Sequence, residues 1–255
     1  MMKLDATAIA AGVRLIAHDV LESTNAHALT LAQRGERGPL WITAQRQTAG
    51  RGRRGRTWVS QPGNLYATLL LASPGRPQCW PQLSLVAGLA LHDALIEIAP
   101  SLTRRVAIKW PNDLLLDDAK FAGILIEGEG GKEAIAIGIG VNCASHPAKS
   151  HYPATDLASA GMAIAPEMLF APLSRKMLGR LAQWNGGEGF TTIRCDWSAR
   201  ANGLGEEIRV RLADRELTGR FEALDDDGAL VLRVADGGAV TVTAGELVMV
   251  RSSRA

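Results

Sequence analysis

The sequence predicts an α+β fold, in which helices pack on a mixed or antiparallel sheet and a small SH3-like β-barrel follows at the C-terminus. Residues 106–127 alternate β-prone runs with tight turns, which is typical of an antiparallel meander. Residues 81–98 carry apolar side chains at helical spacing. Residues 205–250 hold five short strand-like runs, and five strands in about 50 residues are typical of a small barrel. We therefore expect two domains, residues 1–203 and 204–255.

Composition places the chain among ordinary globular proteins. It has 255 residues, of which 47% are hydrophobic and 21% charged, and its net charge is +2. Affinity for nucleic acid would therefore have to come from a local cluster of charge. The three cysteines, Cys79, Cys143 and Cys195, are isolated in the sequence and indicate reduced thiols. Since the sequence shows no apolar leader and no run approaching about 18 apolar residues, we expect a cytoplasmic protein that does not enter a membrane.

The N-terminal part predicts one strand and one helix. The first 21 residues indicate a strand or an irregular piece, too short for a helix-turn-helix domain. Residues 26–34 then predict a helix, with a Ser or Thr N-cap before it and Gly35 just past its end. The polar residues Ser23, Thr24 and Asn25 either only cap this helix or also line a pocket for a small polar group.

The middle of the chain predicts core elements. Residues 40–44 and 64–71 read as strands, the latter buried on at least one face. The helix over 81–98 begins near Pro81. On this helix, His92 is interpreted as a partly buried or surface residue because no metal-type residue follows at the third or fourth position.

The remaining helices and loops are predicted in the same way. Residues 134–142 predict a buried strand that ends in the polar Asn142, and residues 144–166 predict a loop. Residues 166–184 predict a helical stretch interrupted at Pro172, and residues 189–201 predict another helix.

The most distinctive segment, residues 48–58, contains four arginines and three glycines. No Asp or Glu lies between Glu36 and Asp93, so these arginines have no acidic neighbour in the sequence. Guanidinium groups pair bidentately with carboxylate or phosphate, and glycine lets backbone N–H groups approach a ligand. The segment therefore predicts a flexible loop that binds an external anion, the alternative being a solvated basic loop.

Two phosphate-binding motifs do not fit this loop. Its glycine spacing matches the dinucleotide fingerprint, which requires a helix after it and an acidic residue about 20 positions on. Residues 57–64 contain Pro62 and Gly63 where that helix would begin, and the acid is missing. A Walker loop ends in Gly-Lys-Ser/Thr, whereas this one ends in Gly55-Arg56-Thr57.

A second group of polar residues follows the first strand of the meander. Lys109 would end a core strand, and lysine is rarely buried without a partner. It therefore either extends to the surface or is reserved for an anionic ligand. Asn112 and Asp113 in the next turn suit turn formation and contacts to magnesium or ribose equally well.

Five motifs together make the chain similar to biotin protein ligases, the biotin–[carboxyl-carrier] ligases. Each motif alone is weak, but in this order they are highly specific, and they extend over most of the first 142 residues. Thr48, which has no assigned role, stands where that family often has glutamine. The motifs are Glu22-Ser-Thr-Asn25, Gln47-Thr-Ala-Gly-Arg-Gly-Arg-Arg-Gly-Arg-Thr-Trp58, Lys109-Trp-Pro-Asn-Asp113, Lys120-Phe-Ala-Gly-Ile-Leu125 and Gly138-Ile-Gly-Val-Asn142.

The resemblance implies a ligase-like catalytic domain, the SH3-like C-terminal module and an ATP-dependent reaction in two steps. The carboxylate of biotin would attack the α-phosphate of ATP, giving biotinyl-5'-AMP and pyrophosphate, and a lysine of a biotin carboxyl carrier protein would then accept the biotinyl group. Biotin and ATP are thus the expected substrates, with Mg²⁺. Because carboxylate and triphosphate are both anionic, fixed cations are needed between them. The C-terminal module is expected to support ATP or the carrier rather than to contact biotin.

The resemblance also implies roles for individual residues. Arg53, Lys109 and Lys120 would be the catalytic cations. Trp58 would stack on adenine, Arg56 would bind phosphate, and Asp113 is the candidate Mg²⁺ ligand. The residues expected to bind biotin and the adenylate are Ser23, Thr24, Asn25, Gln47, Gly50, Arg51, Gly52, Arg53, Lys120 and Gly123. Those expected to bind ATP are Arg56, Trp58, Lys109, Asn112, Asp113 and Asn142.

The expected partner is the biotin carboxyl carrier domain of a biotin-dependent carboxylase. Only 22 residues precede Ser23, so we expect the ligase-only form without a DNA-binding domain, as a monomer or weak homodimer. Two alternatives stay open. A lipoate or octanoate protein ligase shares the fold and chemistry, although that family lacks the arginine-glycine loop. A nucleic-acid-binding module would use the same loop, but net charge is low and only two tyrosines and four phenylalanines are present for base stacking.

Overall fold

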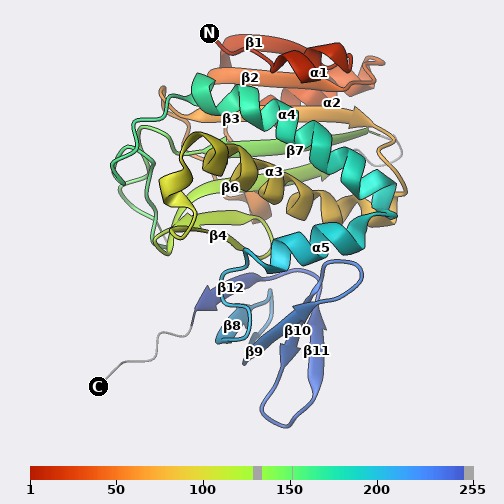
Figure 1. The fold of residues 1–255 in the computed structure, drawn as a ribbon, viewed down its shortest axis with the longest axis vertical. Helices are drawn as coiled ribbons and strands as arrows, with labels where there is room; N and C mark the ends of the chain where they lie inside the picture. Colours follow the sequence, from red (N-terminus) through yellow and green to blue (C-terminus); the bar gives the residue numbers. More distant parts are fainter. Residues whose placement is uncertain (129–133, 151, 250–255) are drawn as a thin grey trace.

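The computed structural model describes residues 1–128, 134–150 and 152–249, which form a helix-covered mixed sheet and, below it in Figure 1, a small antiparallel sheet. This is the predicted α+β class. Residues 129–133, 151 and 250–255 lie outside this description, including the end of the last predicted strand run, at Val250.

The large sheet has seven strands among the described residues, in the order β1-β2-β3-β7-β6-β5-β4. Only β1 and β2 pair in parallel, and every other neighbouring pair is antiparallel. The meander predicted from the turn residues is confirmed as β4, β5 and β6. The strands are β1 (Arg14–Leu21), β2 (Leu40–Gln47), β3 (Leu65–Ala72), β4 (Val106–Lys109), β5 (Asp113–Leu116), β6 (Ala119–Gly128) and β7 (Ala134–Val141).

The two faces of this sheet have different covers, because side chains alternate between faces along each strand. In β3, Leu65, Ala67 and Leu69 face the main core, which is built with α3, α4 and α5. The next position, Leu70, faces a smaller core with Ala28 of α2. The helices are α1 (Ala6–Ala10), α2 (Thr24–Gln33), α3 (Leu83–Ile98), α4 (Pro166–Trp184) and α5 (Phe190–Ser198).

Two helical details differ from the sequence prediction. Residues 6–10, expected in a strand or irregular piece, form α1, whose N-cap Asp5 accepts a hydrogen bond from the Thr7 amide. The predicted interruption at Pro172 is wrong, since α4 continues through it. Proline removes one backbone donor, but the neighbouring Phe170 and Leu173 are fully buried, and this packing keeps the helix intact.

The helix α3 is a core helix. Together with the residues before it, Pro77–Ile98 is long and apolar enough to cross a membrane by composition, but 78% of that window is buried within the protein. His92 on this helix was expected to be partly buried or at the surface, and it is instead buried, with a side chain only 8% exposed. The helix is covered by α4, α5 and the sheet, so few of its positions reach solvent.

The C-terminal module is a five-stranded antiparallel sheet in the order β11-β10-β9-β8-β12, as expected from its five strand runs. It is joined to the rest of the molecule by packing and by the Trp110 indole N–H, which donates to the Gly228 carbonyl at 3.0 Å. The main hydrophobic core therefore extends from the large sheet and its helices into the C-terminal module. The strands are β8 (Glu207–Arg211), β9 (Glu216–Leu224), β10 (Leu230–Arg233), β11 (Ala239–Val242) and β12 (Glu246–Met249).

Candidate functional site

The main cavity lies on the sheet face that α2 covers only in part, and it has a volume of about 910 Å³ including its open mouth. Most residues that the sequence singled out meet here, although they come from four separate segments. Those that line it are Ser23, Thr24, Asn25, Gln47, Arg51, Gly52, Arg53, Arg56, Trp58, Lys109, Asn112, Asp113, Lys120 and Gly123.

Strand register explains why distant residues meet. Directly opposite residues on paired strands share a face. Lys109 pairs with Asp113, and Asp113 pairs with Gly123. The row continues from Gly123 to Gly140 and then to Tyr66. One row of paired residues across five strands therefore forms the floor of the cavity.

A β-bulge in β6 brings Lys120 into the same cavity. In a regular strand Lys120 and Gly123, three positions apart, would face opposite sides. The register with β5 shifts here, so that Phe121 has no partner of its own. Phe121 and Ala122 are consecutively buried in the core, and Lys120 and Gly123 both face the cavity. Bulges next to active sites re-aim side chains in this way.

Glycines on the floor make room for larger side chains. A Cβ on Gly138 would lie 2.3 Å from Asn25 Oδ1, and one on Gly140 would lie 2.6 Å from Trp58 Cε2. A Cβ on Gly123 would lie 3.2 Å from both Trp58 Cζ3 and Lys120 Nζ. The glycines thus let Trp58 and Lys120 lie directly on the sheet.

One end of the cavity is a buried polar network at the start of α2. Ser23 caps this helix, as predicted, and accepts from the Ala26 amide at 3.4 Å. Gln47 Oε1 accepts from the Thr24 amide at 2.8 Å. The Thr68 hydroxyl lies 2.8 Å from Thr24 Oγ1 and 2.6 Å from Asn25 Oδ1. Residues 23–25 therefore both cap the helix and line the pocket, so the two interpretations of this segment hold together.

The other end is strongly cationic. Lys109 has no ion pair within 4.0 Å among the described residues, and burial lowers its pKa despite the nearby charge of Asp113. Burial likewise lowers the pKa of Arg53, and the charges of Arg54 and Arg56 add to this effect. Arg53 Nη1 donates to Asn112 Oδ1 at 2.8 Å. Positive charge is held here at a cost in desolvation, as expected of a site for an anion.

Two of the four loop arginines have acidic partners in the folded chain, although no acid is near them in the sequence. Arg51 Nη2 lies 3.0 Å from Glu127 Oε2, and Arg56 Nη2 lies 2.5 Å from Glu246 Oε2. These acids are distant in the sequence and come from the ends of β6 and β12. Each side chain of the two pairs is 20% to 44% exposed, so a ligand can compete for the arginines.

Lys120 has three neighbours in the cavity. Its Nζ lies 2.6 Å from Asp113 Oδ1, 5.4 Å from the centre of the Trp58 ring and 5.0 Å from the centre of the Tyr152 ring. Among the described residues there is no group of three or more His, Cys, Asp or Glu side chains that could hold a metal ion. Asp113 therefore shares the cavity with several cations and with one other carboxylate, that of Glu246.

Two expected site residues do not line the main cavity. Gly50 is buried, its carbonyl accepts from the Trp58 amide at 2.9 Å, and a Cβ there would lie 2.4 Å from the Trp58 carbonyl oxygen. Asn142 lines a smaller neighbouring hollow with Trp58, Lys120 and Tyr152, and its amide donates to the Thr155 carbonyl at 3.0 Å. Gly50 shapes the loop, and Asn142 ties the loop after β7 to the site.

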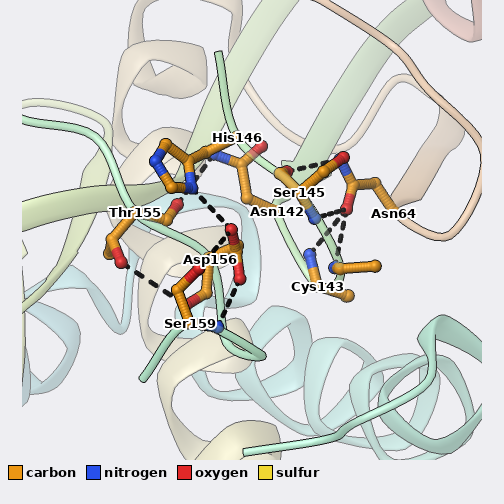
Figure 2. Close-up of polar contacts among 9 residues, drawn as sticks. Asn64, Asn142, Cys143, Ser145, His146, Thr155, Asp156 and Ser159 are labelled. Atoms are coloured by element: carbon orange, nitrogen blue, oxygen red, sulfur yellow. Dashed lines mark hydrogen bonds and ion pairs between the residues drawn. The ribbon is translucent and has the colours of Figure 1, made fainter. Parts of the chain in front are cut away.

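The loop after β7 is held by buried polar contacts, which Figure 2 shows. Asn64 Oδ1 accepts from the backbone amides of Cys143, Ala144 and Ser145 at 2.9 to 3.2 Å. Nearby, His146 Nδ1 lies 2.5 Å from Asp156 Oδ2, and the Ser159 amide donates to Asp156 Oδ1 at 2.6 Å. The loop that carries Tyr152 is therefore anchored at both ends.

Sequence reasoning missed several lining residues. Gly138 and Gly140 stand out in the sequence only as part of a motif, although glycine inside a strand often marks a close approach. Tyr152 carried no signal within its loop. Gly245 and Glu246 reach the cavity from the C-terminal module, and only the packing of the module against the large domain reveals them.

Family models match most of the chain. The model of the biotin/lipoate A/B protein ligase family matches residues 17–143, and that of the biotin protein ligase C-terminal domain matches residues 203–250. A biotin--[acetyl-CoA-carboxylase] ligase of Paracoccus denitrificans is 45% identical over 83% of this chain and 91% of its own length. The bifunctional ligase/repressor BirA of Escherichia coli is 34% identical over 84% of this chain and 67% of its own length.

Solved structures agree with these relatives. A biotin protein ligase from Aquifex aeolicus in complex with biotin and ATP matches with a TM-score of 0.80 at 28% identity, covering 94% of this chain and 99% of that chain. A ligase from Leishmania major in complex with biotinyl-5-AMP matches with a TM-score of 0.66 at 26% identity, covering 91% of this chain and 99% of that chain.

Proposed function

The chain belongs to the biotin protein ligase family, and on this basis we propose that it activates biotin with ATP and transfers it to a carrier lysine. In the first step a carboxylate oxygen of biotin bonds to the α-phosphorus of ATP, and pyrophosphate leaves with the electrons of the broken P–O bond. In the second step the lysine amine attacks the carbonyl of the mixed anhydride, AMP leaves and the amine loses a proton. The observation that carries this proposal is the row of paired residues that joins a polar pocket to a cluster of cations.

We assign biotin to the end of the cavity at the start of α2. Ser23, Thr24 and Gln47 offer hydroxyl, backbone and amide groups to the polar ring of the substrate. Lys120 and Arg53 lie further along the cavity, where they would meet the carboxylate and neutralise charge as the α-phosphate approaches. Preorganised cations of this kind lower the repulsion between two anions without reorganising during the reaction.

We assign ATP to the opposite end. Trp58 offers a ring face for adenine, and its buried indole N–H has no hydrogen-bond partner among the described residues, so it is free to donate to a ligand. Arg56 and Lys109 would bind phosphates, and Asn112 holds Arg53 in place. Asn142 would act from the neighbouring hollow, next to Trp58.

Mg²⁺ fits this site only as an ion brought in with the nucleotide. Mg²⁺ is commonly held by one or two carboxylates together with substrate phosphates and waters. Asp113 Oδ1 already lies 2.6 Å from Lys120 Nζ, and Glu246, the other carboxylate of the cavity, is paired with Arg56. We propose that Asp113 supplies one oxygen to the ion, whose charge would offset that of the triphosphate.

The acceptor we propose is the biotin carboxyl carrier domain of a biotin-dependent carboxylase. We also propose the division into residues 1–203 and 204–255, supported by the change from helices to short strands after α5. The three cysteines are free in the described structure, which supports a reducing compartment such as the cytoplasm. We propose a monomer or weak homodimer as the working state.

The proposed function is tested by two measurements. With ATP and biotin, the protein should release pyrophosphate and label a lysine of a biotin carrier domain, and labelling should be lost when either substrate is omitted. Calorimetry should detect biotin and not lipoate. Lipoate binding with transfer to a lipoyl domain would support the alternative ligase. Binding of mixed DNA and RNA that weakens with salt would support the nucleic-acid alternative.

A further inference from the structure

The side chain of Lys120 lies between two aromatic rings. Its ammonium is 5.4 Å from the centre of the Trp58 ring and 5.0 Å from that of Tyr152, both within the range of a cation–π contact. The side chain is only 13% exposed. Asp113 supplies the third contact, at 2.6 Å from Nζ. The ammonium therefore has three partners, and it lies close to Gly123, where an added Cβ would be 3.2 Å from Nζ.

The backbone of Lys120 fixes the position of the loop that carries Tyr152. The Lys120 amide donates to the Pro153 carbonyl at 2.8 Å, and the Thr155 amide donates to the Lys120 carbonyl at 2.9 Å. Asn142 adds a bond from its side chain to the Thr155 carbonyl at 3.0 Å. Tyr152, the residue before Pro153, is thus placed over Lys120 by the backbone of Lys120 itself.

A lysine needs such support at this place because of the bulge. The side chain leaves β6 next to the unpaired Phe121, and it crosses Gly123, which offers no side chain to confine it. A flexible four-carbon stem has many accessible rotamers, so holding it in one of them costs entropy. Asp113 alone would hold Nζ at one point and would leave the stem free to swing.

We infer that Tyr152 is a positioning residue for Lys120, closing an aromatic cage with Trp58 that keeps the ammonium where the carboxylate and α-phosphate meet. This rests on the proposed function, because it gives Lys120 its task. The ring, not the hydroxyl, does the positioning, since the phenol oxygen of Tyr152 has no hydrogen bond among the described residues. The cage acts on Lys120 before any substrate binds.

The first test measures the chemical reactivity of the Lys120 amine and does not depend on catalysis. The ligand-free protein is treated briefly with an acetylating reagent, and acetylation of Lys120 is followed by peptide mass spectrometry. Tyr152→Leu should raise the rate of Lys120 acetylation about fivefold, a change on the scale of one cation–π contact. Tyr152→Phe should match the wild type. Val59→Ala, at an exposed neighbour in the same hollow, is the matched control and should also match it.

The second test is a double-mutant cycle on biotin-dependent pyrophosphate release. Tyr152→Leu should lower kcat about tenfold with little change in the KM for ATP, and Tyr152→Phe should restore it. In a Lys120→Gln background, Tyr152→Leu should have almost no further effect. An additive loss together with a raised KM for ATP would show that Tyr152 contacts the nucleotide instead, and unchanged Lys120 acetylation in Tyr152→Leu would also overturn the inference. A wild type that releases no pyrophosphate would reject the proposed function, while the acetylation test would still decide the cage.

Discussion

The guanidinium of Arg56 is held by both carboxylate oxygens of Glu246, 190 positions later in the chain, with distances of 2.5 and 3.2 Å. This bond raises the pKa of Arg56 and lowers that of Glu246, so both groups stay charged at neutral pH. The C-terminal module thereby supplies an anion to an arginine that is expected to bind phosphate. If Arg56 binds phosphate as proposed, the module and the nucleotide would compete for the same cation.

Glu246→Gln should lower the KM for ATP and leave biotin binding unchanged, because it removes the competing carboxylate. An ion pair this exposed is worth up to about 1 kcal/mol, so the gain should not exceed about fivefold. Steady-state pyrophosphate release and biotin calorimetry measure the two effects. The control is Glu216→Gln, which breaks a pair with Arg211 outside the cavity and should change neither. A higher KM for ATP in Glu246→Gln would mean that the glutamate helps to hold the nucleotide.

Lys109→Ala should slow adenylate formation by at least ~10²-fold, the scale for losing one preorganised electrostatic group. Folding should be little changed, because the buried lysine has a lowered pKa and no ion pair among the described residues. Pyrophosphate release measures the rate of adenylate formation, and a thermal melt measures the stability of the fold. Lys176→Ala, which breaks a surface pair with Glu97, should leave the rate unchanged. Normal release in a folded Lys109→Ala protein would reject the phosphate role.

Substitutions at two floor glycines should separate the two substrates. Gly140→Ala places a Cβ 2.6 Å from the Trp58 ring and should raise the KM for ATP about tenfold by displacing the adenine platform. Gly138→Ala places a Cβ 2.3 Å from Asn25 Oδ1 and should raise the KM for biotin instead. Each variant is the control for the other. If both variants change the KM for the same substrate, the assignment of biotin and ATP to opposite ends of the cavity is wrong.

Acidification should destabilise the fold through His27. Burial lowers the pKa of His27 below its ordinary value of 6.5, with further contributions from the charges of His18 and Arg34. The unfolded chain then takes up more protons, so stability present above the unfolded pKa is lost as the pH falls from that value through the lower folded pKa. Between about pH 7.5 and about pH 5.5, urea midpoints should fall less for His27→Gln than for the wild type. Equal decreases in the urea midpoint for the two proteins would show that His27 does not cause the loss of stability at low pH.

The arginine-glycine loop should be mobile without ligand and should close over biotin or biotinyl-AMP. Its arginines repel one another, and ordering its glycines costs backbone entropy, which a bound anion offsets. Limited trypsin digestion measures the mobility of the loop directly. Its cleavage sites there are Arg51, Arg53, Arg54 and Arg56. Cutting should be fast in the free protein, slow with biotin and ATP, and little slowed by ATP alone. Equal protection in all three states would indicate a preformed loop.

The sequence by itself determined the local parts of this protein. Residues 106–127 predicted a meander from tight turns, and Gly35 predicted a helix end; both depend on short-range geometry and both are confirmed. The sequence predicts Lys109 at the end of a core strand, and Lys109 ends β4 and lines the cavity. Residue types and their spacing are enough to predict these local elements, because backbone sterics and turn formation depend on residues that are neighbours in the sequence.

Only the tertiary structure decided which groups meet. The alternation rule would separate Lys120 from Gly123, and a bulge set by pairing with β5 puts them on one face. The sequence showed no acid near Arg56, and Glu246 reaches it because the C-terminal sheet packs beside the cavity. The continuous helix through Pro172 also depends on packing against distant residues. Register, bulges and domain packing depend on contacts between residues far apart in the chain, whose free energy a local pattern does not contain.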